Sequence, residues 1–215
     1  MKILAIETAT AICSVGFINN GKCVALVEDR IPREHAERLP LFYQELIKQI
    51  DLELNNIDAI AVSIGPGSFT GLRIGLSYAK GLSYSHNKPI IPVPTLESLV
   101  FGSNIDFKNA IVLLLSHGTK CYLQQFQKSG DSYKSDEIQP LELHSIKELG
   151  NLTNDTKIIH YGCEKLFDDK SISFETINPS ARLIGELASI NYDKWVNKEP
   201  YQIVPQYISP FKIGG

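Results

Sequence analysis

A glycine-rich bend joins an apolar run to a long helical pattern, and it is the feature that most constrains this fold. Residues 63–73 read SIGPGSFTGLR and continue the apolar stretch Ala59–Ile64. Clustered glycine and proline end the strand expected there, and a helix is expected to follow from about Thr70 to Ser85. Another short apolar run, Ile90–Val93, comes after this helix. Strand, helix and strand in this order predict a βαβ crossover and a partly parallel sheet.

Two interpretations of the bend stay open from its residues alone. Free N–H groups at a helix N-terminus attract anions, so the bend is a candidate cradle for phosphate or carboxylate. The alternative is a tight turn whose helix is capped by the hydroxyl of Ser68 or Thr70. The bend is not a Walker loop, because Leu72 and Arg73 stand where that motif requires lysine and a hydroxyl residue. The candidate anion- or nucleotide-binding residues here are Gly65, Gly67 and Ser68.

The helix after the bend carries a stripe of small residues. Gly71, Gly75 and Ala79 repeat every four residues and so lie on one face of the helix. Each helical glycine costs about 1 kcal/mol relative to alanine, so we expect packing outside the helix to offset that cost. Apolar residues flank the stripe, which predicts burial on two sides. One side is expected to be the chain's own sheet, and the other either the helix Ala36–Ile50 or a partner protein.

Two domains are predicted from the order of the other elements. Three antiparallel strands are expected within residues 2–28, with a hairpin turn at Asn19–Gly21, followed by an amphipathic helix at Ala36–Ile50. The pattern restarts after a linker near residues 102–109, so we expect domains at residues 1–102 and 108–215. In the second domain, strands are expected at 110–115, 120–127, 133–138, 157–161 and 173–177, and a helix at 180–192.

Charge and composition argue against several classes of protein. Lys plus Arg is 21 and Asp plus Glu is 24, a formal charge of −3, which does not favour a stand-alone nucleic-acid binder or a membrane-surface protein. The longest apolar run, Ala110–Leu115, is far shorter than the roughly 20 residues of a membrane span. The four cysteines lie far apart and the five histidines form no H-E-x-x-H motif, so we expect reduced cytosolic thiols and no metal site.

The first turn of the chain is similar to the phosphate-binding turn of actin-like ATPases. Residues 6–10 read IETAT and place hydroxyl groups where those enzymes hold a phosphate. Those enzymes have an aspartate and then a glycine in this turn, whereas this chain has Glu7 and no glycine before Gly16. Nucleotide hydrolysis is therefore the weaker interpretation. Glu7 and Thr8 join the candidate anion- or nucleotide-binding residues.

Together these motifs closely resemble the bacterial TsaB (YeaZ) family. The resemblance is carried by Ile3–Thr8, His35–Pro40 and Ile57–Gly75, and it continues through Ala79–Leu82 and Pro92–Leu99. It covers residues 1 to about 100 well and the second half weakly. The resemblance implies an α/β protein with the two-domain actin-like ATPase (ribonuclease H-like) fold, in which each domain has a mixed sheet with flanking helices.

The resemblance also implies a function. TsaB-like proteins are non-catalytic subunits that activate TsaD, the related subunit that carries the metal and the catalytic site. With the ATPase TsaE, they transfer a threonylcarbamoyl group to the adenosine next to the anticodon of tRNAs that read A-starting codons. For this chain the resemblance implies a cytoplasmic accessory subunit with TsaD-like and TsaE-like partners, and not an enzyme. TsaB-like proteins can also form a homodimer through the two helices that pair with TsaD. The chain is expected to contact tRNA only through the complex, where Arg73, Lys80 and Lys88 could contribute.

The partner interface is expected on the helices Ala36–Ile50 and Thr70–Ser85, in agreement with the excess apolar surface of the second helix. The expected interface residues are His35, Leu39, Phe42, Tyr43, Leu46, Gly71, Arg73, Ile74, Gly75 and Tyr78. We expect no catalytic residue, no metal, no membrane contact and no cofactor, apart from ATP or ADP at the interface of the complex. Two alternatives remain, an independent actin-fold ATPase or phosphotransferase and a metalloprotease.

Overall fold

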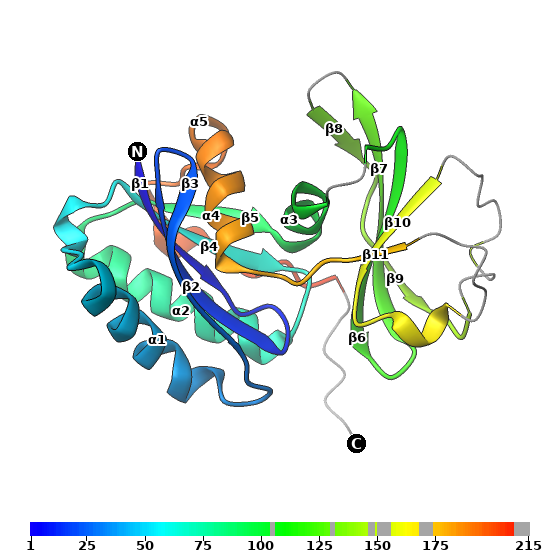
Figure 1. Ribbon diagram of the computed structural model, residues 1–215, viewed down its shortest axis with the longest axis horizontal. Coiled ribbons are helices and arrows are strands. Elements are labelled where there is room, and N and C mark those ends of the chain that lie inside the picture. The colour runs from blue at the N-terminus through cyan, green and yellow to red at the C-terminus, as the bar shows by residue number, and fades with distance from the viewer. Residues whose placement is uncertain (104–105, 130–131, 146–148, 150–155, 168–173, 209–215) are drawn as a thin grey trace. The chain divides into compact units, whose positions relative to one another are not determined.

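The chain forms two compact units, each built on its own sheet (Figure 1). The computed structural model describes residues 1–103, 106–129, 132–145, 149, 156–167 and 174–208. Unit 1 comprises Met1–Phe101 and Pro179–Gln206, and unit 2 comprises Gly102–Asn178 and Tyr207–Gly215. Among the helices in the described ranges, none is long and apolar enough to cross a membrane.

Unit 1 is built on a mixed sheet whose strands follow the order β3-β2-β1-β4-β5. These strands are β1 (Lys2–Glu7), β2 (Ile12–Asn19), β3 (Lys22–Arg30), β4 (Ala59–Gly65) and β5 (Ile90–Pro94). The first three are antiparallel, and the turn between β2 and β3 has Asn20 and Gly21 at positive φ, as the Asn-Gly pair predicts. Strands β1, β4 and β5 are parallel, so the predicted crossover and the partly parallel sheet are confirmed.

Helices cover both faces of this sheet (Figure 1). Helices α1 (His35–Ile50) and α2 (Phe69–His86) pack on one face, and α4 (Ala181–Ile190) packs on the other. Successive residues of a strand point to opposite faces, so Leu4 and Ile6 face α1 and α2, whereas Ile3 and Ala5 face α4. Burial on both faces explains why β1 reads as a continuous apolar run.

The boundary of unit 1 differs from the one expected from the sequence. The helix expected near 180–192 is α4 followed by the short α5 (Tyr192–Trp195), and both belong to unit 1 rather than to a domain at 108–215. Helix α4 packs with unit 1 because it buries an apolar face of the sheet that would otherwise be exposed to water. This face consists of Ile3, Ala5, Ile18, Ala59, Ala61, Ile91 and Val93, and α4 covers it with Ala181, Ile184, Leu187 and Ala188. The expected linker includes residues 104–105, which lie outside the described residues.

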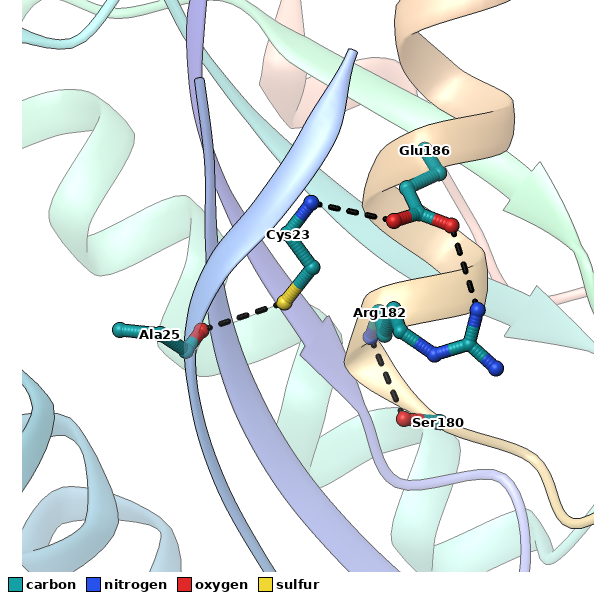
Figure 2. Close-up of polar contacts among 5 residues, drawn as sticks. All are labelled: Cys23, Ala25, Ser180, Arg182 and Glu186. Atoms are coloured by element: carbon teal, nitrogen blue, oxygen red, sulfur yellow. Dashed lines mark hydrogen bonds and ion pairs between the residues drawn. The ribbon is translucent and has the colours of Figure 1, made fainter.

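Polar contacts fix α4 against the edge strand β3 (Figure 2). One Glu186 oxygen accepts a hydrogen bond from the Cys23 N–H at 3.0 Å, and the other accepts from the Arg182 guanidinium at 3.3 Å. The Ser180 hydroxyl caps α4 by accepting from the Arg182 N–H at 3.2 Å. On β2, the Ser14 hydroxyl accepts from the Ala181 N–H at 2.7 Å. The helix that completes unit 1 is therefore positioned by hydrogen bonds as well as by apolar packing.

Unit 2 is built on a second mixed sheet, in the order β11-β10-β6-β7-β8, with β9 paired to β7. Its strands are β6 (Asn109–His117), β7 (Lys120–Ser129), β8 (Ser132–Ser135), β9 (Gln139–Glu142), β10 (Thr156–Tyr161) and β11 (Phe174–Thr176). Strand β6 is parallel to β10 and antiparallel to β7. Helix α3 (Thr95–Gly102) precedes this unit in the chain. Strand β9 was not expected from the sequence, whereas the two mixed sheets with flanking helices are confirmed.

Candidate functional site

The two helices expected to bind a partner lie side by side on one face of unit 1 (Figure 1). The rings of Tyr43 on α1 and Tyr78 on α2 meet edge to face, with centroids 5.7 Å apart. Burial raises the pKa of Tyr78 to about 12, so its hydroxyl stays neutral. Several apolar side chains on these helices are only partly buried. We call five of them the α1–α2 strip: Tyr43, Ile47, Ile74, Tyr78 and Leu82.

Four of the expected interface residues belong to the core of unit 1 instead. His35, Leu39, Phe42 and Leu46 are buried on the side of α1 that faces the sheet. The His35 ring lies 3.2 Å from the Ile12 carbonyl oxygen. The 3–4 spacing of α1 therefore marks the face that packs within the chain. Leu39, Phe42 and Leu46 belong to the core cluster on which the α1–α2 strip packs, and none of the four residues is exposed.

The stripe of small residues on α2 is also internal, which corrects the expectation that Gly71 and Gly75 line a partner interface. A Cβ atom on Gly71 would overlap with the Thr8 carbonyl oxygen, and one on Gly75 would overlap with the Thr8 hydroxyl. The Thr8 hydroxyl donates to the Gly71 carbonyl at 2.9 Å, and Ala79 is fully buried. The glycines are needed because α2 passes directly over the end of β1.

The remaining expected interface residues lie where a partner could reach them. Tyr43, Ile74 and Tyr78 are half-buried, and Arg73 is exposed. The Arg73 guanidinium lies over the Phe69 ring, 3.6 Å from its centroid, which is a cation–π contact. Leu41 on α1 was not among the expected residues, and its side chain is 51% exposed. That these helices bind a partner stays a prediction.

Hydrogen bonds within the chain close the glycine-rich bend. The Ser68 N–H donates to the Ala9 carbonyl at 2.7 Å, and the Ser68 hydroxyl accepts from the Gly71 N–H at 3.2 Å. A Cβ atom on Gly67 would overlap with the Ala9 carbonyl oxygen. Gly65 has a φ of +114°, which few other residues adopt. These contacts favour the interpretation of the bend as a capped turn, because two of its N–H groups already have acceptors.

Glu7 ends β1 with a fully buried carboxyl group. One of its oxygens accepts from the Ala9 N–H, and the other has no hydrogen-bond partner within the described part of the chain. Burial raises the pKa of Glu7 to about 7, and Glu28 adds to this effect, while hydrogen bonds from Ala9 and Ser63 oppose it. Glu7 therefore keeps its proton to a much higher pH than an exposed glutamate does. The neutral acid can donate a hydrogen bond, whereas the carboxylate would repel an anion.

The candidate anion- or nucleotide-binding residues come together at one edge of the sheet. Glu7 and Thr8 stand at the end of β1, and the Thr8 N–H lies 3.4 Å from the Ser63 hydroxyl on the neighbouring strand β4. The bend from Gly65 to Ser68 follows β4 and contacts Ala9. The sequence thus placed these residues in one region, but many of their polar groups already bond to one another. Binding of an anion or nucleotide there stays a prediction.

Two further observations concern metals and pockets. Among the described residues, no group of three or more His, Cys, Asp or Glu side chains is arranged to hold a metal ion. A pocket of about 620 Å³ lies beside the C-terminal half of α2 and includes Lys80, Tyr84, Lys88, Lys198 and Tyr201 in its lining. The sequence drew attention to Lys80 and Lys88. It gave no signal for Lys198 and Tyr201, because the return of residues 198–201 to α2 is a long-range feature of the fold, and nothing local distinguished Tyr84 from other residues of α2.

Comparison with known proteins relates the chain to tRNA modification proteins. The family model described as TsaD: tRNA N6-adenosine threonylcarbamoyltransferase matches residues 29–180. The tRNA threonylcarbamoyladenosine biosynthesis protein TsaB of Escherichia coli strain K12 is 43% identical over 103 residues, which are 48% of this chain and 44% of that protein. The match thus spans less than half of the length of this relative.

Two further similarities extend over nearly the whole chain. The TsaB protein of Haemophilus influenzae is 25% identical over 221 residues, covering 97% of this chain and 93% of that protein. The solved structure of YeaZ from Pseudomonas aeruginosa has a TM-score of 0.79 at 22% identity, and the match covers 96% of this chain and 99% of that one. This likeness shows the fold of the chain.

Proposed function

The chain belongs to the family of the TsaD model, in its TsaB (YeaZ) branch, and on this premise we propose that it is an accessory subunit in the biosynthesis of threonylcarbamoyladenosine in tRNA. In this role it pairs with a TsaD-like subunit and activates it. The TsaD-like subunit transfers the threonylcarbamoyl group to the adenosine next to the anticodon of tRNAs that read A-starting codons. A TsaE-like ATPase assists, the complex works in the cytoplasm, and any ATP or ADP binds at the interface of the complex.

The observation that carries this proposal is the α1–α2 strip. Its five apolar side chains are only partly covered by unit 1, and they come from the two neighbouring helices α1 and α2. Covering apolar surface on docking contributes about 25 cal/mol per Å², so such a strip favours association. The strip, rather than the glycine stripe, is the proposed contact.

The match to the TsaD model supports a related subunit as the partner. The model spans residues 29–180 and therefore includes both α1 and α2. A subunit of that family has counterparts of these two helices, so the two pairs of helices can pack against each other about an approximate two-fold axis. A homodimer of this chain would use the same surface with exact symmetry, and it would compete with the heterodimer.

The proposed role is non-catalytic, with the reaction carried out by the partner. In support, Thr8, Ser68 and Gly71 hold one another in a closed arrangement at the site where the sequence suggested phosphate binding. One observation favours a second candidate, an independent ATPase or phosphotransferase. The buried Glu7 carboxyl, with one oxygen lacking a partner in the described residues and a pKa of about 7, has the properties of a general base. Nucleotide turnover by the isolated, purified chain tests this candidate.

The proposal is tested by co-expressing the chain with the TsaD-like subunit of the same organism. We expect the two to co-elute in size-exclusion chromatography, and Ile74→Glu to weaken pairing at least tenfold because it places a charge in the α1–α2 strip. The matched control is Ile190→Glu, since Ile190 is 69% exposed on α4, on the other face of the sheet. Equal pairing by both variants would refute the strip as the contact.

A second measurement addresses the reaction itself. Depletion of the chain in its own cell, followed by mass spectrometry of tRNA nucleosides, is expected to reduce threonylcarbamoyladenosine. Wild type and Ile190→Glu should restore the modification, and Ile74→Glu should not. Unchanged levels of the modified nucleoside after depletion would refute the proposed function. Metal analysis of the purified chain decides the metalloprotease alternative, which requires stoichiometric zinc or iron.

A further inference from the structure

A basic pocket lies beside the C-terminal half of α2, entirely within unit 1. Its volume is about 620 Å³, within the range of pockets that hold small ligands. One wall is α2, and the other is the segment from Lys198 to the short 3₁₀ helix Pro200–Gln202. Asn197 fixes this segment, because its backbone exchanges hydrogen bonds with Ile90 at the start of β5, at 2.8 and 3.0 Å. The pocket is thus formed by backbone that the sheet holds in place.

Three lysines, Lys80, Lys88 and Lys198, line this pocket, and none of its lining residues, all of them in described parts of the chain, is acidic. Lys80 donates to the Tyr201 carbonyl oxygen at 3.2 Å, and Lys88 donates to the Asn55 carbonyl oxygen at 2.8 Å. Carbonyl groups accept hydrogen bonds but do not neutralise charge, and each ammonium has further protons to donate. With Lys198, the lining residues carry a formal charge of +3 in a chain whose formal net charge is −3, and the exposed Glu199 beside Lys198 offsets part of it. An anionic ligand would be attracted to this pocket.

Two tyrosine rings accompany the lysines. Tyr84 is 92% exposed and Tyr201 is 71% exposed. Rings so exposed contribute little to the core of unit 1. Aromatic rings beside lysines are the combination by which proteins bind single-stranded nucleic acid, since bases stack on the rings and phosphates contact the ammonium groups. A ligand that carries both phosphates and planar bases uses every feature of this pocket.

We infer that this pocket binds unpaired nucleotides of RNA, with phosphates on Lys80, Lys88 and Lys198 and bases on Tyr84 and Tyr201. The identification of this RNA as tRNA rests on the proposed function, in which the complex acts on tRNA. The inference adds that this chain itself makes one of the contacts to the tRNA. The pocket is separate from the α1–α2 strip. Lys80 stands about 200° around α2 from Tyr78, because a helix turns about 100° per residue. The chain can therefore bind its partner and RNA at the same time.

The inference is tested with residues 1–215 and a fluorescein-labelled octamer of uridylate, by anisotropy across a range of KCl concentrations. The test variant is Lys80→Gln/Lys88→Gln/Lys198→Gln. We expect at least tenfold weaker binding at low salt, and a salt slope smaller by about 2, because each neutralised contact to single strands contributes about 0.7. The matched control is Lys22→Gln/Lys120→Gln/Lys134→Gln, which removes the same charge from exposed positions outside the pocket. It should change affinity less than twofold.

The stacking component has its own matched pair of variants. Tyr84→Ala should weaken binding at least fivefold, whereas Tyr84→Phe keeps the ring and should bind like the wild type. Both substitutions are at an exposed position, so they leave the fold intact. Equal losses in the two lysine variants would overturn the inference by showing a general charge effect. Binding of uridine monophosphate as tight as that of the octamer would also overturn it, because the site would then hold a free nucleotide.

A final arm uses the complex with the TsaD-like subunit and unmodified tRNA. The pocket-lysine variant should pair normally but bind tRNA more weakly than the control variant. Normal pairing with unchanged tRNA affinity would overturn the inference and leave the proposed function intact. Failure of the wild-type chain to pair would refute the proposed function instead, and the octamer titration, which needs no partner, would still decide whether the pocket binds RNA.

Discussion

Glu7 is expected to make the folded chain more stable in mild acid than above neutral pH. Its carboxyl is fully buried, and burial raises its pKa from 4.5 to about 7. Between these values the folded state holds a proton that the unfolded chain has released, so the free energy of unfolding falls as pH rises. At about 1.4 kcal/mol per pH unit, the difference between 4.5 and about 7 gives roughly 3 kcal/mol when titration is complete.

Urea unfolding of the wild type and Glu7→Gln at several values between pH 5 and pH 8 measures this effect. Glutamine has a similar shape but does not titrate, so the contributions of other groups cancel in the difference between the two proteins. The nearby Cys13 has a pKa of about 12, raised mainly by burial and also by Glu7, and it stays protonated throughout. We expect the variant to gain between about 2 and 3 kcal/mol relative to the wild type from pH 5 to pH 8. A difference that is constant with pH would refute the reasoning.

Other predictions concern α2 and α4. Gly71→Ala should lower the free energy of unfolding by about 2 kcal/mol or more, because its Cβ atom would overlap with the Thr8 carbonyl oxygen. Gly81→Ala should raise the free energy of unfolding by about 0.5–1 kcal/mol, since a Cβ atom there meets nothing within 4 Å and alanine favours helix. Thermal unfolding compares the Gly71→Ala and Gly81→Ala variants, and equal effects on stability would contradict the packing argument. Glu186→Ala should lower the free energy of unfolding by about 1–2 kcal/mol, because it removes the acceptor of the Cys23 N–H. Glu186→Gln keeps an acceptor and should lower the free energy of unfolding less in the same assay.

Local patterns in the sequence predicted the elements of unit 1 well. The Asn-Gly pair before β3 and the periodicities of α1 and α2 depend on neighbouring residues, and each placed its element within a few residues. These local patterns did not predict which distant segments of the chain contact one another. The small residues of α2 showed that something approaches the helix closely, but nothing local indicated that it is Thr8, 63 residues before Gly71. Substitution at Gly71 or Gly75 therefore tests folding rather than partner binding.

The candidate site was predictable to a similar extent. Periodicity identified the apolar residues of α1. It could not distinguish those that the sheet buries, such as Leu39, from those that stay half-buried, such as Tyr43. The burial of Glu7 depends on β1 being central in the sheet, with β2 and β4 as neighbours. The basic pocket joins Tyr84 to Tyr201 across more than one hundred residues of sequence, and only the folded chain brings the two together.

The late position of α4 in the chain affects how unit 1 is made on the ribosome. The sheet face that contains Ile3, Ala5 and Ile18 is synthesised first, but α4, which covers it, follows residues 102–178. At about 5–20 residues per second, translating that insertion takes roughly 4 to 15 seconds. During this interval the nascent chain presents an uncovered apolar sheet, a surface that chaperones bind. A transcript truncated within the insertion yields a product that keeps this surface exposed and is a substrate for aggregation or proteolysis.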